Sequence, residues 1–243
     1  MLTGFESVKL NYFTATNVLI ALCATVFLLE MLTLNSTTHL ALHYWQSPSF
    51  HPWQFLSHLF VHGGLMHLVF NMLGLWMFGR VLEQVWGTVR FLLFYLVCGI
   101  GAALVYQLVN HYQFQAAIQP LLDAGVSLKD VFQILAYVQF PSSEQAVRIF
   151  SSPVVGASGA IYGILAGFAY CFPNHKLIFL LLPWPVPAKF FVPALLAFDL
   201  YASVTGFSVF GANIAHEAHI GGAVIGFLLT LVIMRKRKLP VKD

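Results

Sequence analysis

The chain has 243 residues, of which 59% are hydrophobic and only 9% are charged, and its formal net charge is +3. Soluble globular domains carry about 25% charged residues, so this composition excludes that class and predicts an integral membrane protein. The small positive charge gathers in the C-terminal tail, which favours contact with the anionic headgroups of a lipid bilayer and argues against a nucleic-acid partner.

Apolar runs long enough to cross about 30 Å of hydrocarbon as helices recur along the whole chain. They predict six membrane spans, at residues 17–34, 66–85, 91–109, 153–172, 190–205 and 218–234. The predicted fold is therefore an all-α bundle of transmembrane helices that forms a single membrane domain over residues 1–243.

Basic residues predict how this bundle is oriented. The run Arg235-Lys236-Arg237-Lys238 follows the last predicted span directly. The positive-inside rule assigns such a run to the cytoplasm, and an even number of spans places the other terminus there too. We therefore expect a multi-pass protein of the inner (plasma) membrane with both termini in the cytoplasm.

A long polar stretch interrupts the apolar pattern at residues 110–152. It carries charged residues, including Asp123 and Asp130, together with helical periodicity at positions such as Val131 and Leu135. The pattern predicts an extramembrane helical insert between spans three and four.

Ser158 and His219 stand near the starts of predicted spans four and six. In the expected topology both spans enter from the non-cytoplasmic face, so the two side chains lie at similar depth. Polar groups inside a bilayer are costly and are usually functional. A hydroxyl with an imidazole beside it is the pairing that nucleophilic catalysis uses, with serine as nucleophile and histidine as general base.

Glycines spaced by four residues predict that these two spans approach closely. Gly159 and Gly163 lie on one face of span four, and Gly222 and Gly226 lie on one face of span six. Such rows of small residues let two helix backbones pack together. A serine in a membrane helix is more often a packing element, and it is the pairing across two glycine rows that favours catalysis.

Other side chains are predicted to serve the same site. Tyr162, one turn after Ser158, is expected to stack on or bond the imidazole and so to replace the carboxylate of a catalytic triad. His216 is an alternative base, but it lies farther from the glycine row. Asp199 stands as a lone acid in span five, with no partner indicated by spacing.

An amide under attack develops a negative oxygen that needs hydrogen-bond donors. His67 and Asn71 are four residues apart and share one face of span two, so they could supply donors together with the backbone N–H of Ser158. The alternative role for this pair is hydrogen bonding between helices. Glu83, at the other end of the same span, is expected to be a structural clamp on neighbouring helices.

Histidines at positions 58, 62 and 67 raise the alternative of a zinc or copper site. Gly63 and Gly64 interrupt the series, and no carboxylate or cysteine lies near it in the sequence. We therefore expect no metal ion and no other cofactor.

Four motifs resemble the rhomboid family of intramembrane serine proteases, of bacterial type, over nearly all of the chain. They are His58-x-x-x-His62-x-x-x-x-His67-x-x-x-Asn71, Gly79-x-x-x-Glu83-x-x-x-Gly87, Gly156-x-Ser158-Gly159-x-x-Tyr162-Gly163 and Ala218-His219-x-x-Gly222-x-x-x-Gly226. The resemblance implies a rhomboid-like bundle of six transmembrane helices in which the fourth is short and central. It also implies that water enters from the outer face and that peptide bonds in or near transmembrane segments of other membrane proteins are hydrolysed.

Carried over by position, the resemblance implies that Ser158 is the nucleophile, His219 the base, and His67 and Asn71 oxyanion donors. Span five and residues 206–217 would form a lateral gate and its lid. One alternative function is a catalytically silent relative that binds membrane clients, although such relatives usually lack the serine or the histidine. Another is a transporter or proton channel, which predicts internal repeats that this sequence lacks.

Overall fold

The computed structural model describes residues 14–33, 39–137, 144–179, 182–207 and 214–236. Almost all regular structure within these ranges is helical. The helices are α1 (Ala15–Thr33), α2 (Gln54–Ser57), η2 (His58–Phe60), α3 (Leu65–Gly74), η3 (Leu75–Gly79), α4 (Arg80–Trp86), α5 (Thr88–Asp123), α6 (Leu128–Tyr137), α7 (Glu144–Ser151), α8 (Ser158–Cys171), α9 (Ala188–Thr205) and α10 (His216–Lys236). The strands β1 (Lys176–Phe179) and β2 (Leu182–Pro187) form an antiparallel hairpin.

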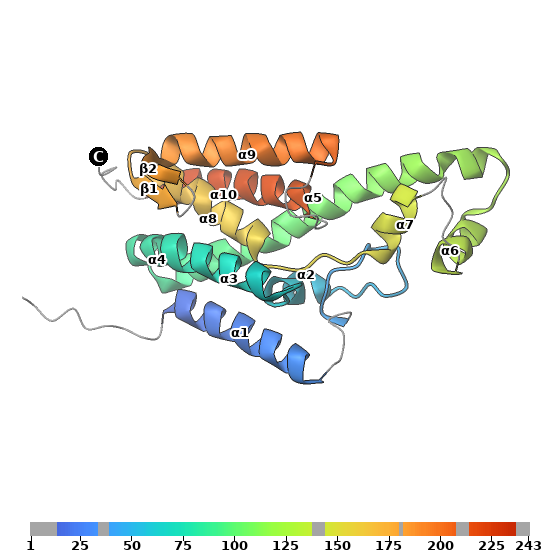
Figure 1. The fold of residues 1–243 in the computed structure, drawn as a ribbon, viewed down its shortest axis with the longest axis horizontal. Helices are drawn as coiled ribbons and strands as arrows, with labels where there is room; N and C mark the ends of the chain where they lie inside the picture. The colour runs from blue at the N-terminus through green and yellow to red at the C-terminus, as the bar shows by residue number, and fades with distance from the viewer. Residues whose placement is uncertain (1–13, 34–38, 138–143, 180–181, 208–213, 237–243) are drawn as a thin grey trace, which may run out of the picture.

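The long helices run side by side as a bundle with two different ends (Figure 1). The β1–β2 hairpin lies at one end, and α6 and α7 lie beyond the other. We call these the hairpin end and the insert end. Helix α9 follows the hairpin and runs to the insert end, and α10 begins at the insert end and returns.

Helix α8 is at the centre of the main core. Ten of its 14 residues are buried, and it packs against α5, α9 and α10. The largest fully buried side chains around it include Trp86, Phe91 and Tyr95. This enclosure fixes the position of the first residue of α8, which is Ser158.

Five described helical segments are apolar and long enough to cross a membrane: Ala15–Leu32, Leu65–Trp86, Thr88–Asp123, Ala188–Thr205 and His216–Arg235. Many of their outward side chains are large and apolar, as lipid contact requires; Leu32 is 80% exposed and Val204 is 79% exposed. The protein is therefore a multi-pass membrane protein. Helix α8 is apolar but shorter, so the count of six spans stays a prediction.

Helix α5 contains the third predicted span, 91–109, and continues without a break to Asp123. Residues 110–123 are polar enough to end an apolar run, yet they lack glycine and contain good helix formers. Pro120 stands only in the last turn. The predicted insert at 110–152 therefore begins as an extension of α5, and α6 and α7 follow it.

The insert has a hydrophobic core of its own, which we call the insert core. Its buried members are Tyr44, Phe114, Ile118, Val131, Leu135, Ala146, Ile149 and Phe150. The ring of Phe114 lies 6.0 Å from that of Phe132 and 6.3 Å from that of Phe150, stacked on both. The described part of the insert is thus a packed structure and not a linker.

The fourth predicted span, 153–172, began too early, because α8 starts at Ser158. Val154 pairs instead with Leu42 in an antiparallel bridge, with both N–H···O bonds at 2.9 Å. Gly156 has φ +117°, a conformation that side chains disfavour. Residues 153–157 are apolar but extended, and they deliver the chain to the first turn of α8.

Candidate active site

Ser158 and His219 meet between the first turns of α8 and α10. The Oγ atom of Ser158 lies 2.9 Å from Nε2 of His219, a hydrogen-bond distance, although the residues are 61 positions apart. His219 is 9% exposed and Ser158 is half-buried. The pair therefore has the geometry of a nucleophile beside a base.

The two glycine rows bring these helices together. A Cβ at Gly222 would overlap the carbonyl of Gly159, and one at Gly226 would overlap the backbone of Gly163. On its other side Gly163 faces Cys98 of α5, whose Sγ would be 2.6 Å from an added Cβ. Only hydrogen atoms fit at this crossing, so the backbones of α8 and α10 are in direct contact.

Tyr162 stacks on the imidazole of His219. The ring centroids are 4.1 Å apart and the planes differ by 11°. The expected stacking is therefore present. The tyrosine does not stand in for the carboxylate of a triad, because a real carboxylate is present at that position.

That carboxylate is Asp199 of α9, whose partners are not indicated by spacing along the chain. Its Oδ1 lies 3.2 Å from Nδ1 of His219 and is also in contact with Nδ1 of His216. Asp199 is 2% exposed. The alternative base His216 thus faces the acid, while His219 lies between the acid and Ser158. The signal available in the sequence was an acid inside an apolar span.

His67 and Asn71 lie on α3, on the other side of the Ser158 turn. A Cβ at Gly156 would be 2.8 Å from Nε2 of His67, so this ring packs on the backbone two residues before Ser158. The N–H of Gly63 donates to Nδ1 of His67 at 3.3 Å. In a neutral ring the proton is therefore on Nε2. Asn71 is buried, and its Nδ2 donates to the His67 carbonyl at 2.8 Å.

His58, the first residue of η2, supports the same turn, and His62 packs edge-on against the ring of His67. The carbonyl of His58 accepts the N–H of Gly156 at 2.9 Å, and its Nδ1–H donates to the Gln54 carbonyl at 2.8 Å. Burial lowers the pKa of His58 to about 4 and that of His62 to about 4. Both rings are therefore neutral at neutral pH.

The histidine series 58, 62 and 67 does not form a convergent metal site among the described residues. The ligand atoms that converge belong to Asp199, His216 and His219, which lie within 4.8 Å of one another. In this structure the three groups form hydrogen bonds among themselves.

Glu83 lies far from this cluster, near the hairpin end. Its carboxylate accepts the backbone N–H groups of Ala15 and Thr16, at 2.7 and 2.9 Å, and the hydroxyl of Thr16 at 2.7 Å. It also accepts the Thr88 hydroxyl at 2.9 Å. Glu83, in the middle of α4, thus joins that helix to the starts of α1 and α5.

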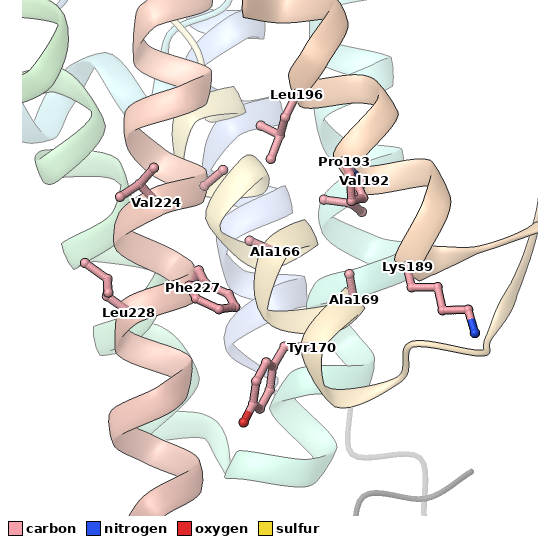
Figure 2. Close-up of a pocket in the computed structure, with 11 residues that line it drawn as sticks. Ala166, Ala169, Tyr170, Lys189, Val192, Pro193, Leu196, Val224, Phe227 and Leu228 are labelled. Carbon is pink, nitrogen blue, oxygen red and sulfur yellow. The ribbon is translucent and has the colours of Figure 1, made fainter.

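Two hollows lie near the helices that form the site. A polar one of about 260 Å³ is lined by residues from α5, α7, α9 and α10, including Arg148, Ser203, His216 and Glu217. It reaches the cluster at His216. An apolar groove of about 390 Å³ runs along α8, α9 and α10, with Lys189 at its edge (Figure 2). Neither Ser158 nor His219 lines the groove, so it is not the reaction chamber.

Comparisons with known proteins show which family the chain resembles. The profile of the Rhomboid domain matches residues 49–236. The chain is 25% identical over 228 residues to "Rhomboid protease GlpG" of Haemophilus influenzae, covering 92% of both chains. It is 27% identical over 175 residues to "Rhomboid protease GluP" of Bacillus subtilis, and 28% identical over 182 residues to "RHOMBOID-like protein 1" of Arabidopsis thaliana. These matches cover 72% and 75% of this chain, but only 25% and 34% of the two relatives.

Proposed function

Because the chain belongs to the rhomboid family, we propose that it is an intramembrane serine endopeptidase that hydrolyses peptide bonds in or near transmembrane segments of membrane proteins. The observation that carries the proposal is the 2.9 Å contact between Ser158 Oγ and His219 Nε2. In the proposed reaction Ser158 Oγ attacks the carbonyl carbon of the substrate while its proton moves to His219 Nε2. His219 then protonates the leaving amine, and water hydrolyses the acyl-enzyme by the same steps.

We assign the stabilisation of the oxyanion to three donors. The first residues of a helix have backbone N–H groups without intrahelical partners, and Ser158 is the first residue of α8. His67 has its neutral-ring proton on Nε2, beside Gly156, and Asn71 has an amide group one turn further along α3. One such donor typically contributes about 100- to 1000-fold to the rate.

The membrane arrangement completes the proposal. We infer that α8 also crosses the membrane, as the fourth of six spans in chain order. At about 1.5 Å per residue its 14 residues reach only about 21 Å, so one end of the helix lies below the membrane surface. Cations at the hairpin end support a cytoplasmic location of that end and of both termini. They are Arg80, Arg90, Lys176, Lys189 and Arg235. The active site then opens to the non-cytoplasmic face. The insert lies outside the membrane on that same face.

Two features support access to this site. The polar hollow of about 260 Å³ beside His216 offers water a path to the cluster. The proposed gate is α9 with the lid at 206–217, of which residues 208–213 lie outside the described ranges. Substrates are transmembrane proteins that reach the site through the bilayer, and the chemistry uses no metal or other cofactor.

The test is cleavage of a transmembrane reporter by purified protein in liposomes. Wild type should cleave, whereas Ser158→Ala and His219→Asn should lose activity by at least about 1000-fold. Ser57→Ala is the control, because this serine lies on α2 and donates to the Leu40 carbonyl. Cleavage by Ser158→Ala would refute the assignment, and an inactive wild type that binds the reporter would favour the silent relative.

A further inference from the structure

Asp199 has a connection to the proposed dyad that the two-residue mechanism does not use. It is the acid of α9, it is 2% exposed, and its Oδ1 is within reach of two imidazoles of α10. A buried charge of this kind is costly unless it is hydrogen-bonded, and it is usually functional inside a membrane. The atoms Ser158 Oγ, His219 Nε2, His219 Nδ1 and Asp199 Oδ1 follow one another at 2.9 Å and 3.2 Å across the ring.

We infer that Asp199 is a positioning residue that holds His219 in the orientation and tautomer in which Nε2 accepts the proton of Ser158. The inference rests on the proposed function and adds a third member to its machinery. It also makes the geometry of the base depend on where α9 lies against α10, because the carboxylate and the imidazole come from different helices.

The tautomer follows from the chemistry of the contacts. A carboxylate oxygen accepts hydrogen bonds, so Nδ1 of His219 carries the proton that points at Asp199. A neutral imidazole has one N–H, which leaves Nε2 with the lone pair that faces Ser158. The other tautomer would present an N–H to the serine and could not act as its base.

The orientation needs the carboxylate as well as the stacking of Tyr162. Stacking fixes the plane of the His219 ring, but a ring flipped by half a turn lies in the same plane. The flip would replace Nε2 by a carbon atom in front of Ser158. A hydrogen-bond acceptor at the ring edge away from Ser158 excludes the flip, because it binds an N–H but not a C–H. Asp199 Oδ1 is this acceptor.

His216 makes the carboxylate a shared acceptor. Its Nδ1 contacts the same Oδ1 atom, so Asp199 is fixed from two sides by α10. A second tie joins the two helices: Ser203 Oγ of α9 donates to Glu217 Oε1 of α10 at 2.8 Å. This tie does not touch either imidazole of the cluster, so contact between α9 and α10 does not depend on Asp199 alone.

The test compares Asp199→Asn with Asp123→Asn in the full-length protein in liposomes. Asp123 is an exposed acid in the last turn of α5, and it accepts a hydrogen bond from Gln119 at 2.8 Å. Asparagine has the shape of aspartate but can present an NH2 group to the imidazole, which favours the wrong tautomer. We expect kcat for reporter cleavage to fall about 100- to 10,000-fold with KM changed by less than about 3-fold. Asp123→Asn should change kcat by less than about 3-fold. Thermal unfolding in detergent should be similar for both variants.

Equal kcat in the two variants and wild type would overturn the inference, as would a loss in Asp199→Asn that is all in KM. A second measurement needs no change at Asp199: ¹⁵N NMR of histidine-labelled protein, with the His219 signals assigned by His219→Asn. The expected result is an N–H at Nδ1 and a bare Nε2; the reverse tautomer would contradict the inference. A fully active Ser158→Ala would sink the proposed function instead, and the tautomer would still be measurable.

Discussion

The backbone carbonyl of Gly159 on α8 faces Gly222 on α10 so closely that no side chain fits between them. Gly222→Ala should therefore push the two helices apart at the level of Ser158 and His219. Overpacking against backbone costs about 1–3 kcal/mol or more. A displacement of about 1 Å at the dyad should reduce cleavage about 100-fold. Reporter cleavage and thermal unfolding of the purified variant measure both effects.

The control for this substitution is Gly64→Ala, because an added Cβ there meets no atom within 4 Å. Its φ of 167° is extended backbone that alanine adopts without strain. We expect near-wild-type stability and activity. If Gly222→Ala were as active as Gly64→Ala, close contact of the glycine rows would not be needed for the site.

Glu83 should be a stability residue and not a catalytic one. Glu83→Gln replaces one acceptor oxygen by an NH2 group and removes the charge that holds the start of α1 and Thr88. Hydrogen bonds to charged groups contribute about 1.5–3 kcal/mol each, so we expect a loss of about 2–3 kcal/mol. Unfolding in detergent measures it, with the exposed Glu144→Gln as control. A stability equal to that of the control would refute the clamp.

The stability of the fold should fall in mild acid because of His58. Burial lowers its pKa from 6.5 to about 4, so between these values the unfolded chain binds more protons than the folded one. The free energy of unfolding is therefore unaffected by this group above about pH 6.5 and decreases as the pH falls toward 4. The decrease from His58 is up to about 3 kcal/mol.

The measurement is the unfolding temperature of wild type and of His58→Asn between pH 7.5 and pH 4.5. Asparagine retains an N–H donor for the Gln54 carbonyl but does not titrate. We expect the variant to lose less stability in acid than wild type. Parallel curves for the two proteins would show that His58 does not carry this dependence.

The insert core should be able to open while the bundle stays folded. Phe114 is fully buried among the rings of Tyr44, Phe132 and Phe150. Phe114→Ala should cost about 3–5 kcal/mol locally and increase proteolysis of α6 and α7 more than tenfold. Tyr112→Ala is the control, because this side chain of α5 is 78% exposed. Loss of the whole bundle in Phe114→Ala would show that the two cores fold as one.

The sequence could predict the meeting of Ser158 and His219 because their helices carry glycines at a four-residue spacing, which identifies the faces in contact. It could not predict the partner of Asp199. The imidazoles near this acid follow it by 17 and 20 residues, on another helix and beyond a loop. Spacing along one helix holds no information about how a neighbouring helix is rotated about its axis.

Hydropathy also could not predict where the helices end. Residues 110–123 are polar but helical, whereas residues 153–157 are apolar but extended. Residues 110–123 are helical because of their helix propensity and their packing in the insert core. Residues 153–157 are extended because of Pro153, the bridge to Leu42 and the backbone conformation of Gly156. The second difference bears on the site, because it places Ser158 in the first turn of α8.

The central claim is that Ser158 is a nucleophile activated by His219, and covalent trapping tests it most directly. A fluorophosphonate loses fluoride when an activated serine oxygen attacks its phosphorus, which leaves a stable adduct. Peptide mapping by mass spectrometry should find the adduct on Ser158 in wild type and a loss of at least about 1000-fold in its rate of formation in His219→Asn. An adduct on another serine, or unchanged labelling of Ser158 without His219, would contradict the account.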